Sequence, residues 1–154
     1  MFMKKRAAFS LSEIAIIMMI IGILAGITYI AIGSQIEKAE AARYLSELDT
    51  VRAGLLAHKF GNLSRTEDPL VALANRPLEN QRQEIESMLE KPLYQGLRNN
   101  LVVSFDVRSR RVSVGFTGLQ VSGSVEKKLQ HMIGKSSQGF TWNSSKGDLS
   151  LVVR

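Results

Sequence analysis

The sequence predicts an α+β fold, in which one long N-terminal helix packs on an antiparallel sheet of about four strands. Residues 9–60 contain no proline and keep helical character, first as an apolar run and then with apolar residues at helical spacing. From Leu101 onward the apolar residues alternate with period two, and turn residues divide this region into two strand pairs.

The first part of the predicted helix is long enough to cross a lipid bilayer. Residues 14–32 carry no charge, and nineteen residues at ~1.5 Å each span about 28 Å, close to the ~30 Å hydrocarbon thickness. Lys4, Lys5 and Arg6 precede this run, whereas the basic residues beyond it are interspersed with acids. The positive-inside rule therefore places the short N-terminus in the cytoplasm and the large domain outside.

Glu13 is the ionisable residue at the head of this apolar run. A carboxylate costs roughly 2.5–3.5 kcal/mol to insert at the centre of a membrane, and less near the interface. No Lys, Arg or His lies between Glu13 and Lys38, so the apolar helix offers no cation of its own. We expect Glu13 to find a cationic partner outside its helix; the alternative is an interfacial glutamate that pairs with nothing.

The residues directly before the apolar run form a specific motif. Phe9-Ser10-Leu11-Ser12-Glu13 is followed by the run without a gap. Residues 9–27 thereby resemble the N-terminal segment of type IV pilins and pseudopilins, in which a phenylalanine, a small hydroxyl residue, a leucine, any residue and a glutamate precede a long apolar helix. Beyond about Gly33 the resemblance is architectural.

The resemblance implies that residues 1–8 are a leader, which a prepilin peptidase removes by cutting between Ala8 and Phe9. It implies N-methylation of the new Phe9 amine, and pairing of Glu13 with the N-terminal amine of a neighbouring subunit. Residues 9–36 would then be both the inner-membrane span and the assembly helix of a helical filament. The implied partners are further copies of the chain, other pilins, the prepilin peptidase and the inner-membrane assembly platform.

Three features depart from the family pattern. Ala8 stands where a glycine is usual before the cleaved bond. The proline that commonly kinks the helix would fall at Ile30, so Gly22, Gly26 and Gly33 are the predicted soft points. Many pilins have a pair of cysteines in the C-terminal region, whereas this chain has no cysteine. This excludes disulfides, thiol catalysis and cysteine-based metal sites.

Two other interpretations stay open. The chain could be a minor pilin or a pseudopilin of a type II secretion or competence machine. From another class, it could be a signal-anchored periplasmic binding module that does not polymerise. A conventional signal peptide would end at Ala31-Ile32-Gly33 and leave Ser34 as the first residue, although the apolar run is longer than the usual 7–15 residues.

Residues 37–154 are predicted to form a globular head. Residues 37–60 continue as an amphipathic helix, and Gly61-Asn62 is its expected end, with Gly61 suited to a left-handed conformation. Residues 61–100 form a variable helical loop region. In it, Asp68-Pro69 begins a short helix to about Asn75, and Asn80 with Gln83 resembles a capping box that opens a helix to Glu90.

Residues 101–154 are predicted to form the antiparallel sheet, with a helix inserted between two hairpins. The expected elements are a hairpin of residues 101–108 and 112–116 around Ser109-Arg110, a bulge at Gly115 and Gly118, a helix from Ser124 to Gly134, and a hairpin of residues 140–142 and 149–153.

Charge is distributed unevenly along the head. Residues 37–90 contain 7 Lys/Arg and 10 Asp/Glu, whereas residues 91–154 contain 10 Lys/Arg and 3 Asp/Glu. This asymmetry fits an unevenly charged soluble surface, complementary packing between subunits, or a basic face that attracts a polyanion such as DNA.

No catalytic or metal-binding pattern is found. His58 and His131 are the only histidines, and both are expected at the surface. Residues 143–148 offer one acid and one lysine, a poor set of oxygen ligands for calcium. We therefore expect no enzyme activity, cofactor or metal. The leading hypothesis is a structural subunit of a type IV pilus, serving adhesion, motility or DNA uptake from the bacterial cell surface.

Overall fold

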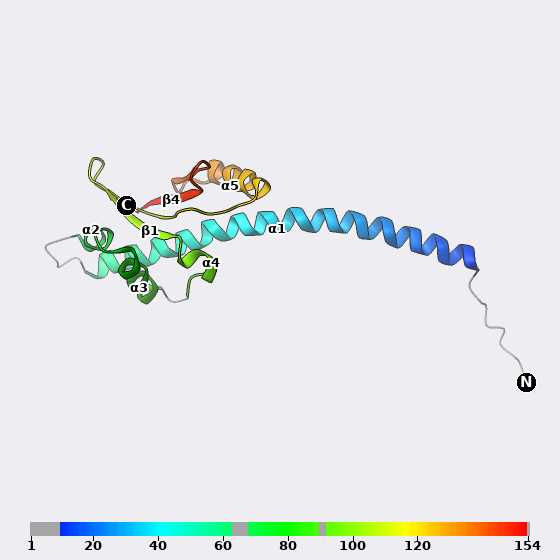
Figure 1. Cartoon of the computed structure of the whole chain (residues 1–154), viewed down its shortest axis with the longest axis horizontal. Coiled ribbons are helices and arrows are strands. Elements are labelled where there is room, and N and C mark those ends of the chain that lie inside the picture. The colour runs from blue at the N-terminus through cyan, green and yellow to red at the C-terminus, as the bar shows by residue number, and fades with distance from the viewer. Residues whose placement is uncertain (1–9, 63–67, 90–91, 154) are drawn as a thin grey trace, which may run out of the picture. The chain divides into compact units, whose positions relative to one another are not determined.

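The computed structural model of the chain describes residues 10–62, 68–89 and 92–153 (Figure 1). The contacts divide the chain into two compact units, Met1–Ile36 and Glu37–Arg154. This division falls where the sequence changes from an apolar to an amphipathic helix. The helix α1 (Leu11–Gly61) runs through this division. In the first unit the described residues are Ser10 and the part of α1 up to Ile36, and in the second unit the rest of α1 is the first helix.

The second unit combines helices with a single antiparallel sheet in its described residues. After α1, the elements are α2 (Pro69–Ala74), α3 (Leu78–Met88), α4 (Gln95–Arg98), β1 (Leu101–Asp106), β2 (Arg111–Phe116), α5 (Gly123–Lys135), β3 (Phe140–Asn143) and β4 (Asp148–Val153). The strand order is β1-β2-β4-β3, and every neighbouring pair is antiparallel. The predicted α+β class, with a long helix packed on four strands, is confirmed.

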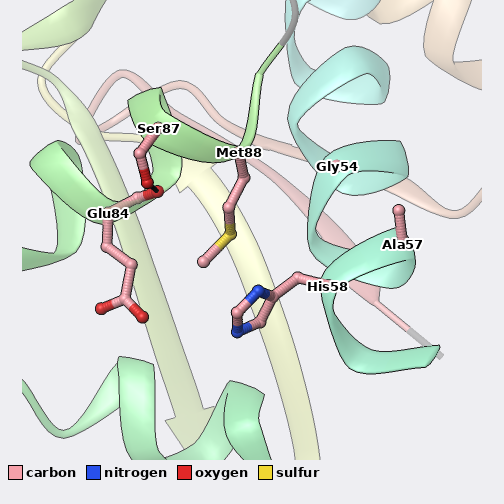
Figure 2. Close-up of a pocket in the computed structure, with 6 residues that line it drawn as sticks. All are labelled: Gly54, Ala57, His58, Glu84, Ser87 and Met88. Carbon is pink, nitrogen blue, oxygen red and sulfur yellow. Dashed lines mark hydrogen bonds between the residues drawn. The ribbon is translucent and has the colours of Figure 1, made fainter. Parts of the chain in front are cut away.

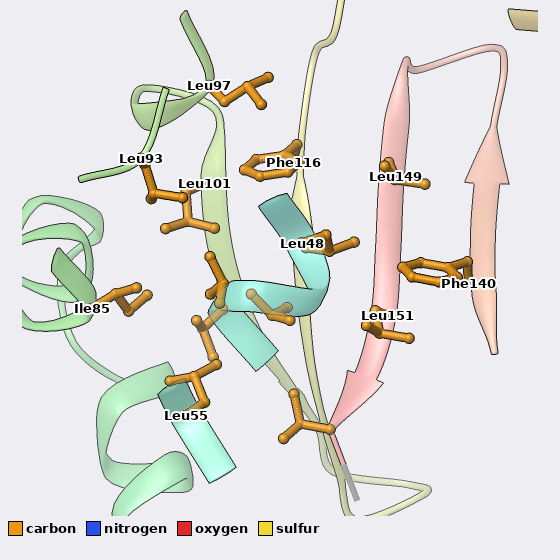
Figure 3. Packing of buried hydrophobic residues seen from close by; sticks show 14 of the residues in the cluster. Leu48, Leu55, Ile85, Leu93, Leu97, Leu101, Phe116, Phe140, Leu149 and Leu151 are labelled. Carbon is orange, nitrogen blue, oxygen red and sulfur yellow. The ribbon is translucent and has the colours of Figure 1, made fainter. Parts of the chain in front are cut away.

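The core lies between the second part of α1 and the sheet. Ala41, Leu48, Val51 and Leu55 recur at helical spacing and are buried. Figure 3 shows Leu48 and Leu55 between residues of the small helices and residues of the strands. The labelled neighbours are Ile85, Leu93, Leu97, Leu101, Phe116, Phe140, Leu149 and Leu151. Burying a leucine or phenylalanine side chain stabilises a fold by about 1.5–3 kcal/mol. These buried side chains therefore hold α1 to the sheet.

The predicted helix starts between α1 and the sheet are partly right. The carboxylate of Asp68 accepts a hydrogen bond from the Leu70 N–H at 3.0 Å, which confirms it as the N-cap of α2. The capping box at Asn80 is wrong, because α3 already begins at Leu78, after Pro77, and Asn80 lies within its first turn. Proline fixes a backbone angle that suits entry into a helix, and this signal outweighed the Asn80 pattern.

The two predicted hairpins are confirmed, but the predicted bulge and the predicted cap of the helix between the hairpins are wrong. The register of β1 with β2 runs without interruption through Gly115, so no bulge lies there. Gly118 instead has a positive φ of 66° in the loop after β2. The cap of α5 is Ser122 and not Ser124, and the helix continues through Gly134 to Lys135.

The predicted end of α1 at Gly61-Asn62 is confirmed, but the left-handed conformation expected of Gly61 is wrong. Gly61 is the last helical residue, and its φ is not positive. The side chain of Asn62 ends the helix instead, because its Nδ2 donates to the His58 carbonyl at 2.9 Å.

The outer edge of β1 is covered by polar side chains from α3. Gln81 is only 3% exposed, and its Oε1 accepts a hydrogen bond from the Val103 N–H at 3.1 Å. Arg82 donates to the carbonyl oxygens of Asn99 and Leu101. An open strand edge is a template for unwanted pairing, and α3 satisfies the Leu101 carbonyl and the Val103 N–H of this one.

Candidate functional site

Glu13 lies in the first turn of α1 and is exposed. Its Oε2 accepts a hydrogen bond from the Ser10 N–H at 2.8 Å, and its own N–H donates to Ser10 Oγ at 3.4 Å. This reciprocal arrangement is a capping box, and the Ser10-x-x-Glu13 spacing could have predicted it. A carboxylate has about four lone-pair sites, so capping leaves Glu13 able to accept from a further donor.

The apolar run behind Glu13 is exposed along its whole length. The most apolar 18-residue window of α1 is 0% buried within the structure. Its length and composition suit a membrane span, so the first unit contains one helix that could cross a bilayer. The hydroxyl of Thr28 donates to the Leu24 carbonyl at 2.8 Å, which satisfies this polar group inside the helix.

The three predicted soft points lie in unbroken helix. A Cβ added at Gly22, Gly26 or Gly33 would meet nothing within 4 Å, so softness at these glycines stays a prediction. Sequence reasoning missed that Gly22 and Gly26 form a G-x-x-x-G pair on one helix face. In apolar helices this spacing lets a second helix approach closely.

The predicted features of the leader lie outside the described residues. This applies to the basic residues Lys4, Lys5 and Arg6 and to the expected cleavage site between Ala8 and Phe9.

One hollow in the second unit gathers residues that could suggest catalysis (Figure 2). Its volume is about 410 Å³, and its lining includes His58, Glu84 and Ser87. Each of these groups is engaged elsewhere. Ser87 donates to the Glu84 carbonyl at 2.6 Å, the Glu84 carboxylate pairs with Arg76, and His58 Nδ1 lies 3.5 Å from Asn62 Nδ2. The three groups therefore form no proton relay.

The two histidines differ in exposure. His131 is exposed, as predicted, whereas His58 is half-buried. Within the described residues no group of three or more His, Asp or Glu side chains is placed to hold a metal ion.

A second hollow, which we call the tyrosine hollow, is lined by Glu40, Tyr44, Tyr94, Asn100 and Gln120, among others, and has a volume of about 490 Å³. The Tyr44 hydroxyl donates to Glu40 Oε1 at 2.8 Å. Burial, together with this hydrogen bond, raises the pKa of Tyr44 to about 12. Tyr44 is therefore a neutral donor at physiological pH, and the exposed Glu40 carboxylate supplies the charge of the hollow.

The ring of Tyr94, which lines the tyrosine hollow, is in contact with a guanidinium. The Arg43 guanidinium carbon is 3.3 Å from the centroid of the Tyr94 ring, which is a cation–π contact.

The basic half of the head concentrates charge in one turn. Residues 107–110 connect β1 to β2, and Arg111 is the first residue of β2. We call residues 107–111 the arginine turn, because it contains Arg108, Arg110 and Arg111. All three arginines are exposed. None of the ion pairs in the described part of the chain includes them.

Comparisons with known proteins identify no relative. No protein-family model matches the chain, and neither the curated proteins nor the solved structures contain a significant match.

Proposed function

We propose that the chain is a non-enzymatic structural subunit of a type IV pilus or a related filament. It waits in the inner membrane as a single-pass protein, with its N-terminus in the cytoplasm. It then polymerises through the apolar part of α1 into a filament that is extracellular or spans the periplasm. Minor pilins and pseudopilins polymerise through the same segment, and fall within the proposal.

The observation that carries the proposal is Glu13 at the head of an apolar helix that has no cation of its own. The capping hydrogen bond from Ser10 uses one acceptor site of the carboxylate and does not neutralise its charge. The nearest basic side chain along the helix toward its C-terminus is Lys38, about 37 Å away at ~1.5 Å per residue. The N-terminal amine of a neighbouring subunit, exposed by cleavage before Phe9, supplies the missing cation.

Two forces then have separate roles. Packing of apolar helix against apolar helix supplies the affinity, and the Gly22/Gly26 pair allows the close approach that such packing needs. The Glu13 pair sets the axial position of one subunit against the next, because a subunit shifted along the axis would leave a charge unpaired in an apolar core.

The test is to express the full chain in a bacterium that has pilus assembly machinery, shear the cell surface and look for filaments by electron microscopy. Glu13→Ala is expected to abolish filaments while leaving the amount of protein in the membrane unchanged. Glu37→Ala is the matched control, because it removes the next acid along the same helix, and it should give filaments at the wild-type level.

Wild-type filament yield from Glu13→Ala would contradict the proposal. Absence of filaments from the wild-type chain, with the protein held as a monomer in the membrane, would favour the signal-anchored binding module instead.

A further inference from the structure

Two features of the head carry opposite charge and form no ion pair within the described residues. The first is the arginine turn, which the structure holds in a defined shape. Asp106 Oδ1 accepts from the Arg108 N–H at 2.9 Å, and Oδ2 accepts from the Ser109 hydroxyl at 2.8 Å. Arg110 takes a left-handed conformation with a φ of 52°. The Asp106 carboxylate is therefore used to hold the turn in shape, and the three arginine side chains of the turn are exposed.

The second feature is the tyrosine hollow, whose chemistry suits a guanidinium. The Glu40 carboxylate is an exposed acceptor, and arginine binds carboxylates through two parallel hydrogen bonds. The side-chain amide of Gln120 is also exposed at this hollow. The Tyr94 ring, which lines the hollow, already stacks with one guanidinium, that of Arg43. Tyrosine and arginine are both enriched in protein interfaces.

The two features lie at opposite ends of one hairpin. Leu101 pairs with Phe116 at one end of β1 and β2, and Asp106 pairs with Arg111 at the other. Asn100, which lines the hollow, directly precedes the first of these pairs. Six residues of strand separate the hollow from the turn, which is about 20 Å at ~3.4 Å per residue. The turn therefore cannot enter the hollow of its own chain.

We propose that the arginine turn of one copy docks in the tyrosine hollow of the next copy. The two contact surfaces differ, so the interface is head-to-tail, and such interfaces form open helical filaments when the rotation between copies does not close a ring. This inference rests on the proposed function, since it names a contact between heads within that filament. The contact would also bring the basic residues 91–154 of one copy against the acidic residues 37–90 of the next.

The absence of cysteine allows a direct test by cross-linking the full chain in cells. Val107 is 76% exposed, and replacing it with cysteine leaves every arginine in place. Val107→Cys is combined with Gln120→Cys in the test variant and with Gln130→Cys, on the exposed side of α5, in the control. Each variant is treated with a short bis-maleimide reagent and separated on a denaturing gel.

The test variant is expected to give a ladder of dimers, trimers and larger products, because every copy carries both halves of the contact. The control is expected to give no ladder. Absence of a ladder from the test variant, or an equal ladder from the control, would overturn the proposal. Loss of the ladder when nuclease treatment precedes cross-linking would also overturn it, since the arginines would then be bridged by nucleic acid.

A second experiment reverses charges in the variant that carries Val107→Cys and Gln120→Cys. Glu40→Arg should reduce the ladder about tenfold or more, because it places like charges opposite each other. Adding Arg108→Glu and Arg110→Asp should restore it, and failure to restore it would overturn the pairing. Filaments are counted by microscopy in the same cells. Filaments without a ladder would refute this contact alone, whereas a ladder without filaments would refute the proposed function alone.

Discussion

Replacing Gln81 with leucine is a test of how the head is held together. The side chain joins three main-chain groups. Its Nε2 donates to the carbonyl oxygens of Ala74 and Arg76 at 3.0 and 2.9 Å, and its Oε1 accepts from the Val103 N–H at 3.1 Å. The side chain is almost completely buried. Gln81→Leu keeps a similar volume and removes all three hydrogen bonds.

The size of the effect follows from these three contacts. Each net hydrogen bond contributes about 0.5–1.5 kcal/mol, and a buried group left without a partner costs about 1–3 kcal/mol. Leucine regains roughly 1 kcal/mol through apolar burial. We therefore expect Gln81→Leu to lower the free energy of unfolding by about 2–3 kcal/mol. With a urea dependence of ~1–3 kcal/mol/M, the midpoint should fall by about 0.7–3 M.

The assay is urea unfolding of the full chain in detergent, followed by the fluorescence of Trp142, the single tryptophan. This residue reports on the fold because it is half-buried in β3, where its Nε1 donates to Glu126 Oε1 at 3.0 Å. Gln83→Leu is the matched control on the same helix, since Gln83 is exposed, and it should change the stability by less than about 0.5 kcal/mol. Equal midpoints for the two variants would refute the bridging role of Gln81.

Three further predictions concern turns and the assembly helix. Gly147→Ala should destabilise the head by more than about 1 kcal/mol, because Gly147 has a φ of 67° and an added Cβ would lie 2.4 Å from the Leu119 carbonyl oxygen; urea midpoints like that of the wild type would count against this. Hydrogen bonds from Ser109 and the Arg108 N–H hold the pKa of Asp106 below its ordinary value; its contribution to stability is therefore present above that ordinary pKa and lost as the pH falls through the folded pKa. As the pH is lowered, the urea midpoint should fall less in Asp106→Asn than in the wild type. An identical fall in both proteins would show that this carboxylate is not involved. Gly22→Leu should reduce filament number in sheared material because a bulky side chain keeps helices apart, and an undiminished yield would exclude close packing at this face.

Most of the fold follows from local patterns in the sequence. The helical run without proline predicts α1, and the alternation of Leu101, Val103 and Phe105 predicts β1. In both cases the local preference and the buried face agree, because Leu101 and Val103 are buried and Phe105 is half-buried. Asp68 before Pro69 likewise predicts the start of α2 correctly.

The errors come from positions where several residues compete for the same role. Ser122 and Ser124 both suit an N-cap, and Gly115 and Gly118 both suit an irregular strand. Tertiary contacts decide between them. Gly115 is needed inside the sheet, because an added Cβ would lie 2.5 Å from the Leu149 carbonyl oxygen.

The candidate site was only partly accessible from the sequence. Glu13 stands out by its charge, and its capping role could have been found from Ser10 three positions earlier. The tyrosine hollow could not, because it joins Glu40 and Tyr44 of α1 to Tyr94 and Gln120, which are distant in sequence. The role of Gln81 was hidden for the same reason, since Val103 lies 22 residues away.

The most direct test of the central claim is the N-terminal sequence of the chain purified from filaments or from membranes of cells that have a prepilin peptidase. We expect Phe9 as the first residue, with a methyl group on its amine, because Glu13 needs that amine from the neighbouring subunit. A chain that still begins at Met1, or one that begins at Ser34, would contradict it.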